Sequence, residues 1–206
     1  MANGRQAAKK RLNRSERAQQ QLELHFPEID DRCMWHRKTN DGFTTVPRTM
    51  PLVMQAVDDV SKGTPPGHTL FCLWARSPDH PLLTIENPAT FAAEAGFKGE
   101  RAVDTWRKRM KRLRDLGMIQ TKKGASGDFH YVLLLNPNAG VEAMRVRKEV
   151  ADELYGRFID RMADVGAMGE IEGIQEYWKE QAAAEIAPTP QTEAPVKSRR
   201  RQAKML

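Results

Sequence analysis

The fold is decided by the stretch from Asn87 to Pro137, which reads NPATFAAEAGFKGERAVDTWRKRMKRLRDLGMIQTKKGASGDFHYVLLLNP. Asn87 followed by Pro88 is a typical helix start, because Asn caps the first turn and Pro needs no N–H at the first helical position. Gly96 predicts the end of that helix, since glycine is favoured where the chain adopts a positive φ. The stretch therefore opens with a short helix.

A second helix is predicted from Glu100 to Leu116. Its apolar residues recur at spacings of three and four, which makes one buried stripe of Val103, Trp106, Met110, Leu113 and Leu116. Another face carries Arg101, Thr105, Lys108 and Arg112, with Arg107, Lys111 and Arg114 beside it and Arg109 adding to the charge. From Lys98 to Lys123 ten Lys or Arg residues face three acids, a net charge of +7. A merely solvated face usually mixes signs, so this one favours a helix that recognises DNA.

Two strands are predicted after Gly117, at Met118–Thr121 and Phe129–Leu135. The residues between them form a loop, because glycine and serine are typical of turns. Lys122, Lys123 and Ser126 lie in this loop and are suited to contacts with phosphates. A plain hairpin turn is the alternative interpretation, and both stay open.

Upstream of this stretch, apolar spacing predicts a helix over Thr49–Lys62. Residues Thr69–Ala75 are strongly apolar, and periodicity does not separate a buried helix from a buried strand there. We expect a helix, because Leu82–Ile85 supplies the strand. The predicted order is then helix, strand, helix, helix, strand, strand, and the first strand should pair with the ribbon in a three-stranded sheet.

This order resembles the winged helix-turn-helix superfamily of DNA-binding domains. The segment is also similar to small DNA-binding proteins carried on bacterial plasmids, in which W-x-x-R-M-x-x-L-x-x-L-G-[FMI]-I precedes G-x-F-x-Y-V-L-L-L-N-P. The matching positions are Trp106, Arg109, Met110, Leu113, Leu116, Gly117, Met118 and Ile119, then Gly127, Phe129, Tyr131–Leu135, Asn136 and Pro137. The resemblance implies DNA binding at plasmid replication, maintenance or regulatory sites.

The expected fold class is α+β, mainly α, with a winged helix-turn-helix domain over residues 25–140 and extra helices before and after it. Residues 1–24 form a basic flexible arm, with a net charge of +5 over the first twenty residues, and 188–206 form a disordered basic tail with a net charge of +4. The arm could follow phosphates or only solubilise the chain, and both interpretations stay open.

Residues 141–187 are expected to form C-terminal helices. The first, Val141–Val165, carries an apolar stripe that one winged domain need not bury, and the second covers Ile171–Ile186. The stripe consists of Met144, Val150, Leu154, Phe158, Met162 and Val165. Packing against its own domain and packing against a second copy are both open. We favour a homodimer, which would fit DNA sites with two half-sites.

Two cysteines, Cys33 and Cys72, indicate free thiols in a reducing compartment. No apolar run approaches the roughly 18 residues of a membrane span, and the basic N-terminus lacks the apolar segment of a signal peptide. We therefore expect a cytoplasmic protein on nucleoid or plasmid DNA, without a membrane partner.

The sequence does not predict an enzyme, a cofactor or a metal. It has no Walker-type loop, no G-x-G-x-x-G and no H-E-x-x-H. His25, Cys33 and His36 are too few for a structural zinc site, which takes about four ligands. The pairs at 30–31 and 58–59 are interpreted as solvent-facing acids and not as a Mg²⁺ cluster.

We therefore expect a sequence-specific binder of double-stranded DNA, of the plasmid or phage transcriptional regulator type, with Arg101 as the first candidate for a contact with guanine. The predicted DNA-binding residues are Lys98, Arg101, Thr105, Arg107, Lys108, Lys111, Arg112, Lys122, Lys123 and Ser126. One alternative is a DNA-binding component of plasmid replication initiation or partition, whose C-terminal part recruits replication or partition proteins. A second alternative is a winged-helix scaffold that binds protein. The net charge of +7 from Lys98 to Lys123 argues against this alternative. RNA binding ranks low, because it usually needs exposed aromatic rings and Trp106 lies on the apolar stripe.

Overall fold

A computed structural model of the chain describes residues 15–186. The chain falls into two units, Met1–Phe43 and Thr44–Leu206. The predicted basic tail at 188–206 lies outside the described residues, as do the first fourteen residues of the predicted arm. None of the helices between residues 15 and 186 combines the length and apolarity that crossing a membrane requires.

The described part of the first unit has no buried core. It contains a helix over 15–25 and the 3₁₀ helix η1 (Asp31–Cys33), and none of its residues from 15 to 43 is buried. Asp30 caps η1 by accepting hydrogen bonds from the side chain and from the backbone N–H of Arg32, which together lower the pKa of Asp30. Trp35 and Phe43 contact each other edge to face, with ring centroids 6.0 Å apart.

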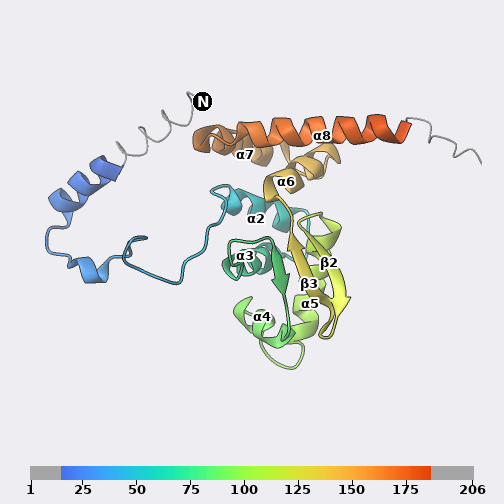
Figure 1. The fold of residues 1–206 in the computed structure, drawn as a ribbon, viewed down its shortest axis with the longest axis horizontal. Helices are drawn as coiled ribbons and strands as arrows, with labels where there is room; N and C mark the ends of the chain where they lie inside the picture. The colour runs from blue at the N-terminus through green and yellow to red at the C-terminus, as the bar shows by residue number, and fades with distance from the viewer. Residues whose placement is uncertain (1–14, 187–206) are drawn as a thin grey trace, which may run out of the picture. The chain divides into compact units, whose positions relative to one another are not determined.

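The second unit begins with two helices, α2 (Met50–Asp59) and α3 (Gly67–Ala75), so the prediction of a helix for the apolar stretch before Arg76 is confirmed. Asp58 accepts a hydrogen bond of 2.6 Å from the backbone N–H of Gly67 and so ties the start of α3 to the end of α2. Two further helices, α4 (Pro88–Glu94) and α5 (Ala102–Asp115), complete the helical part beside the sheet (Figure 1).

The three-stranded antiparallel sheet predicted from the sequence is confirmed. It consists of β1 (Leu82–Thr84), β2 (Ile119–Gly124) and β3 (Gly127–Leu134) in the order β1-β3-β2. Leu83 pairs with Val132, and Ile119 pairs with Leu134. These four side chains are buried, so one face of the sheet belongs to the core that it shares with the helices.

The ribbon of β2 and β3 is longer than predicted. Lys122 and Lys123 lie in β2, where a loop was expected, and only Ala125 and Ser126 form the turn. Pairing of Lys122 with Tyr131 extends the ladder, since a strand can continue through residues of low strand propensity when its partner is in place. The two lysines therefore lie on an edge strand of the sheet and not at the tip of a loop.

The single helix predicted over 141–165 is wrong, because the structure has α6 (Pro137–Val146) and α7 (Asp152–Val165) there, followed by α8 (Met168–Ile186). Lys148 adopts a φ of 59°, and the backbone N–H of Glu149 donates to the carbonyl of Met144 at 3.0 Å, which closes α6. Residues 147–151 contain neither Gly nor Pro, so the sequence gives no signal for this break.

The apolar stripe of the C-terminal helices is buried within one chain. Met144, Leu154, Phe158 and Met162 are at most 4% exposed. Helix α2 contacts both α6 and α7, and Figure 1 shows it between these helices and α3. The stripe that motivated the prediction of a homodimer therefore has its partner inside the chain, and it no longer argues for a second copy.

Buried polar groups join these helices to one another. The Thr49 hydroxyl, at the start of α2, donates to the side-chain carbonyl of Asn138 in α6 at 2.6 Å. In α6 the Glu142 carboxylate accepts hydrogen bonds from the Tyr155 hydroxyl at 2.6 Å and from the Gln175 amide at 2.8 Å. Each of these bonds satisfies a group that would be costly to bury alone, so α2, α6, α7 and α8 hold fixed positions relative to one another.

The phenol of Tyr155 should make stability depend on pH in the alkaline range. Burial, and then the hydrogen bond to Glu142, raise its pKa to about 12. An unfolded tyrosine has a pKa of about 10, so this contribution should be complete below pH 10 and lost as the pH rises to about 12. We expect the free energy of unfolding, measured in urea at several pH values, to fall less between pH 9.5 and 11.5 in Tyr155→Phe than in the parent chain. Equal falls would mean that this phenol is not perturbed.

Candidate nucleic-acid interface

The corner between α4 and α5 is built from local signals. The Asn87 side chain caps α4 by accepting a hydrogen bond from the Ala89 N–H at 3.0 Å, as predicted. Gly96 and Gly99 have φ values of 84° and 79°, which L side chains rarely adopt. These glycines let the chain reverse within a few residues and begin α5.

The inward face of α5 fixes the orientation of the helix. Trp106, Met110 and Leu113 are at most 1% exposed. The Trp106 ring lies 6.4 Å from that of Phe91 in α4 and 5.9 Å from that of Phe129 in β3, measured between centroids. The tryptophan therefore joins both helices and the ribbon, and the opposite face of α5 must point outward.

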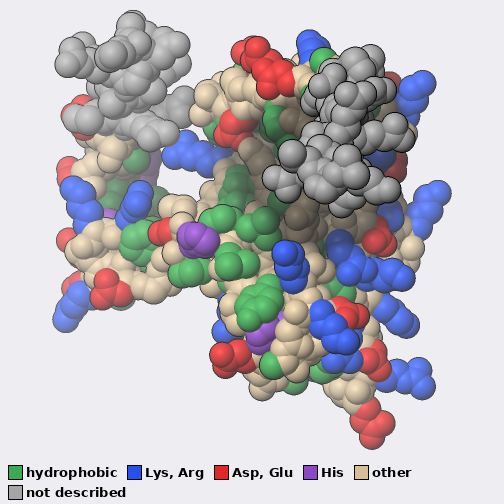
Figure 2. Space-filling view, turned by 45° about the vertical axis from the view of Figure 1, so that its right-hand side comes forward, with side chains coloured by type: hydrophobic (Ala, Val, Ile, Leu, Met, Phe, Trp, Pro, Cys, Tyr) green, Lys and Arg blue, Asp and Glu red, His purple; other side chains and the backbone are tan. Residues whose placement is uncertain are grey.

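The outward face of α5, its N-cap and the adjacent strand β2 together carry most of the predicted DNA-binding residues. The exposed basic side chains of α5, of its N-cap residue and of the adjacent strand β2 are grouped here as the α5–β2 surface: Arg101, Arg107, Lys108, Lys111, Arg114, Lys122 and Lys123. Arg114 connects the two elements, since its guanidinium donates to the Thr121 hydroxyl at 3.4 Å and lies over the Phe129 ring. Along the right-hand side of the molecule in Figure 2, Lys and Arg side chains are spaced at intervals, with some Asp and Glu side chains among them.

The remaining predicted residues differ in their surroundings. Lys98 is exposed in the turn between α4 and α5, whereas Thr105 is half-buried on the flank of α5. Arg109, which the resemblance singled out, is also half-buried and lies over the Phe97 ring, 5.8 Å from its centroid. Lys98 thus extends the basic surface toward the start of α5, and Arg109 contributes to packing.

Two predicted contacts are engaged within the fold. The Arg112 guanidinium donates to the Val60 carbonyl at 2.5 Å and to the buried Ser61 hydroxyl at 2.9 Å, which anchors α5 to the end of α2. The Ser126 hydroxyl donates to the Ile85 carbonyl and lies 2.9 Å from Nδ1 of His130, which joins the turn to the segment after β1. We therefore assign both residues structural roles and leave them out of the interface.

Arg112 offers a direct test of this assignment. Replacing it with alanine should destabilise the protein by about 1–3 kcal/mol, because hydrogen bonds from a charged group are lost and Ser61 stays buried. The salt dependence of DNA binding should keep its slope, whereas Lys111→Ala should reduce that slope by about one. Urea unfolding and a salt series on both variants separate the two roles. The assignment fails if Arg112→Ala lowers the slope and leaves the stability unchanged.

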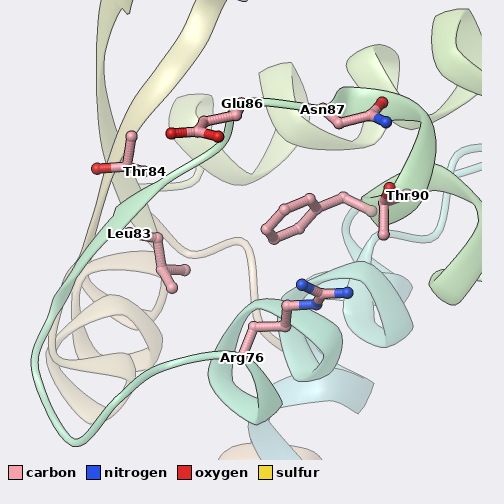
Figure 3. Close-up of a pocket in the computed structure, with 7 residues that line it drawn as sticks. Arg76, Leu83, Thr84, Glu86, Asn87 and Thr90 are labelled. Atoms are coloured by element: carbon pink, nitrogen blue, oxygen red, sulfur yellow. The ribbon is translucent and has the colours of Figure 1, made fainter.

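A small pocket beside α4 contains a charged residue that the sequence did not single out. It has a volume of about 300 Å³ and is lined by Arg76, Leu83, Thr84, Glu86, Asn87, Thr90 and Phe91 (Figure 3). The Arg76 guanidinium lies 4.9 Å from the centroid of the Phe91 ring and pairs with Glu94, which raises the pKa of Arg76 and lowers that of Glu94. Arg76 and Glu94 are far apart in sequence and lack a recognisable pattern, so only the structure reveals this contact between α3 and α4.

The described part of the chain gives no sign of a metal centre. Between residues 15 and 186, no group of three or more His, Cys, Asp or Glu side chains could hold a metal ion. Cys33 and Cys72 are both free thiols, and burial raises the pKa of Cys72.

Comparison of the chain with protein-family models, with curated proteins and with solved structures finds no match. The resemblance to winged helix-turn-helix domains and to plasmid-borne DNA-binding proteins therefore rests on the residues of this chain alone, and it stays a prediction.

Proposed function

We propose that this protein binds duplex DNA in a sequence-dependent manner through a winged helix-turn-helix, with α5 as the recognition helix and the β2–β3 ribbon as the wing. The order α3, β1, α4, α5, β2, β3 is compatible with that fold. The observation that carries the proposal is the α5–β2 surface, whose seven exposed Lys and Arg residues lie at the N-cap of α5, along α5 and on β2, while the opposite face of α5 is buried in the core.

The dimensions of α5 suit the major groove. Its 14 residues span about 21 Å, and a helix with its side chains is about 10–12 Å wide. The major groove of B-DNA is about 12 Å wide and presents a distinct donor and acceptor pattern for each base pair. In this arrangement the N-terminal end of α5, with its N-cap residue Arg101, faces the base edges.

The other basic residues of the surface would act on the DNA backbone. Lysine and arginine side chains neutralise phosphates and release condensed counterions, which makes affinity fall with salt. In the proposed complex, Lys122 and Lys123 on β2 would contact a phosphate strand beside the groove that holds α5. These contacts would set the orientation of the protein, and the base contacts of α5 would set its preference for sequence.

The test is a titration of the full chain against random duplex DNA and against the DNA upstream of its own coding region, over a series of salt concentrations. We expect binding to both at low salt, and a preference for the upstream DNA at salt that dissociates the random complex. Such a preference supports a regulator. Equal affinities that fall steeply with salt would point to a non-specific binder or to a target elsewhere, such as a replication origin. Absence of binding at low salt would refute the proposal.

A further inference from the structure

Helix α5 carries one acidic side chain, Asp104, among the basic side chains of its exposed face. The side chain of Asp104 is 69% exposed and lies in the first turn of the helix. Residues three or four positions apart are neighbours on a helix surface, so Arg101, Arg107 and Lys108 surround it. The second acid of the helix, Asp115, is exposed at the opposite end.

The fold makes little use of the Asp104 carboxylate. Its ion pair with Arg107 has an N–O distance of 3.4 Å, and 49% of the arginine side chain is exposed. Exposed pairs of this kind contribute little to stability. Asp58 shows the contrast, since its carboxylate accepts a hydrogen bond of 2.6 Å from the backbone of Gly67. An acid in the first turn does favour the helix dipole, but any exposed carboxylate there would do so.

On a surface that faces phosphates, a carboxylate opposes binding unless DNA supplies a hydrogen-bond donor. The phosphate and sugar edge of B-DNA supplies none. In the major groove the donors are the N4 amino group of cytosine and the N6 amino group of adenine, and the latter is flanked by the acceptor N7. A carboxylate, which only accepts, therefore matches cytosine better than adenine.

We propose that Asp104 is a specificity-determining residue, which accepts a hydrogen bond from the N4 amino group of one cytosine in the target site. This inference rests on the proposed function, because it assumes that α5 enters the major groove. It adds the class of base that the helix reads: a G·C pair whose cytosine faces the first turn of α5, close to where Arg101 would contact a neighbouring base.

The experiment selects binding sites from a randomised duplex library with the full chain, with Asp104→Asn, and with the matched control Asp115→Asn. Both variants lose one negative charge from an exposed position of α5. Asparagine pairs with N6 and N7 of adenine, so Asp104→Asn should change the preference at one position from cytosine to adenine. The parent chain should discriminate against other bases there by about 5- to 150-fold, the usual cost of one mismatched base pair in a specific site. Asp115→Asn should keep the cytosine.

The outcomes separate this inference from the proposed function. If both variants gain affinity for all sequences alike and select the same bases as the parent, Asp104 does not read a base, although duplex binding stands. If the parent chain does not bind duplex DNA even at low salt, the proposed function itself fails. Asp104→Glu keeps the charge and the acid in the first turn, so it is the control for a folding defect. This variant should still select cytosine, with weaker discrimination. A complete loss of preference in a folded Asp104→Glu variant would overturn the inference.

Discussion

Replacing Lys108 and Lys111 together with alanine is expected to weaken binding to duplex DNA roughly 50-fold at 0.1 M salt. Each phosphate contact contributes about 0.9 to the slope of log affinity against log salt, so two lost contacts should lower that slope by about two. Both lysines are exposed within α5, and alanine is the best helix former, so the fold should not change. Fluorescence anisotropy with a labelled duplex, repeated at four salt concentrations, gives both values.

The matched control removes the same net charge from another part of the chain. Arg157 in α7 and Lys179 in α8 are exposed helical positions away from the α5–β2 surface. If binding depends only on the total charge of the protein, Arg157→Ala with Lys179→Ala will weaken it as much as the α5 pair does. That result would remove the case for α5 as the binding element.

Trp106→Ala should be the most destabilising single substitution in the basic helix, with a loss of about 3–5 kcal/mol. The indole is 1% exposed and contacts the rings of Phe91 and Phe129, so its removal leaves a cavity where α4, α5 and β3 meet. Urea unfolding followed by far-UV circular dichroism measures the loss. This probe avoids a fluorescence signal that four tryptophans would share.

Trp35→Ala is the control for this substitution, since it removes the same atoms from a site where the side chain is 62% exposed. Exposed positions away from special features usually change stability by no more than about 0.5 kcal/mol. A similar loss for both variants would contradict the central position assigned to Trp106 in the core.

The parts of the fold that the sequence predicted correctly depend on local or periodic signals. The Asn87 cap acts over two residues, and the apolar stripe with Trp106 and Met110 repeats at helical spacing. Both signals can be recognised in the sequence without knowledge of the tertiary contacts. The prediction of a helix at Thr69–Ala75 followed from the order of the elements, because Leu82–Ile85 already supplied the strand. These signals sufficed for a mainly helical chain with a three-stranded sheet.

The errors concern features that depend on distant residues. The break at Lys148 has no glycine to mark it, and the apolar stripe continues on its far side, so periodicity predicted one helix. Arg112 belongs by spacing to the basic face, yet it is engaged by Val60 and Ser61, about fifty residues earlier. Ser126 is held in the same way by Ile85. Whether a polar side chain binds its own protein or a ligand is decided by tertiary contacts, which one sequence does not display.

The place of α2 between the helices beside the sheet and the C-terminal helices has a consequence for cooperativity. Its core residues Val53 and Val57 are fully buried, and its first residue is preceded by Thr49, whose hydroxyl is bonded to Asn138 in α6. Neither group of helices can separate without exposing this shared helix, so residues 44–186 should unfold in a single transition. A fragment cut at residue 140 would lose most of α6 and all of α7, which pack against α2, so the basic surface on α5 depends for its stability on helices that lie outside it.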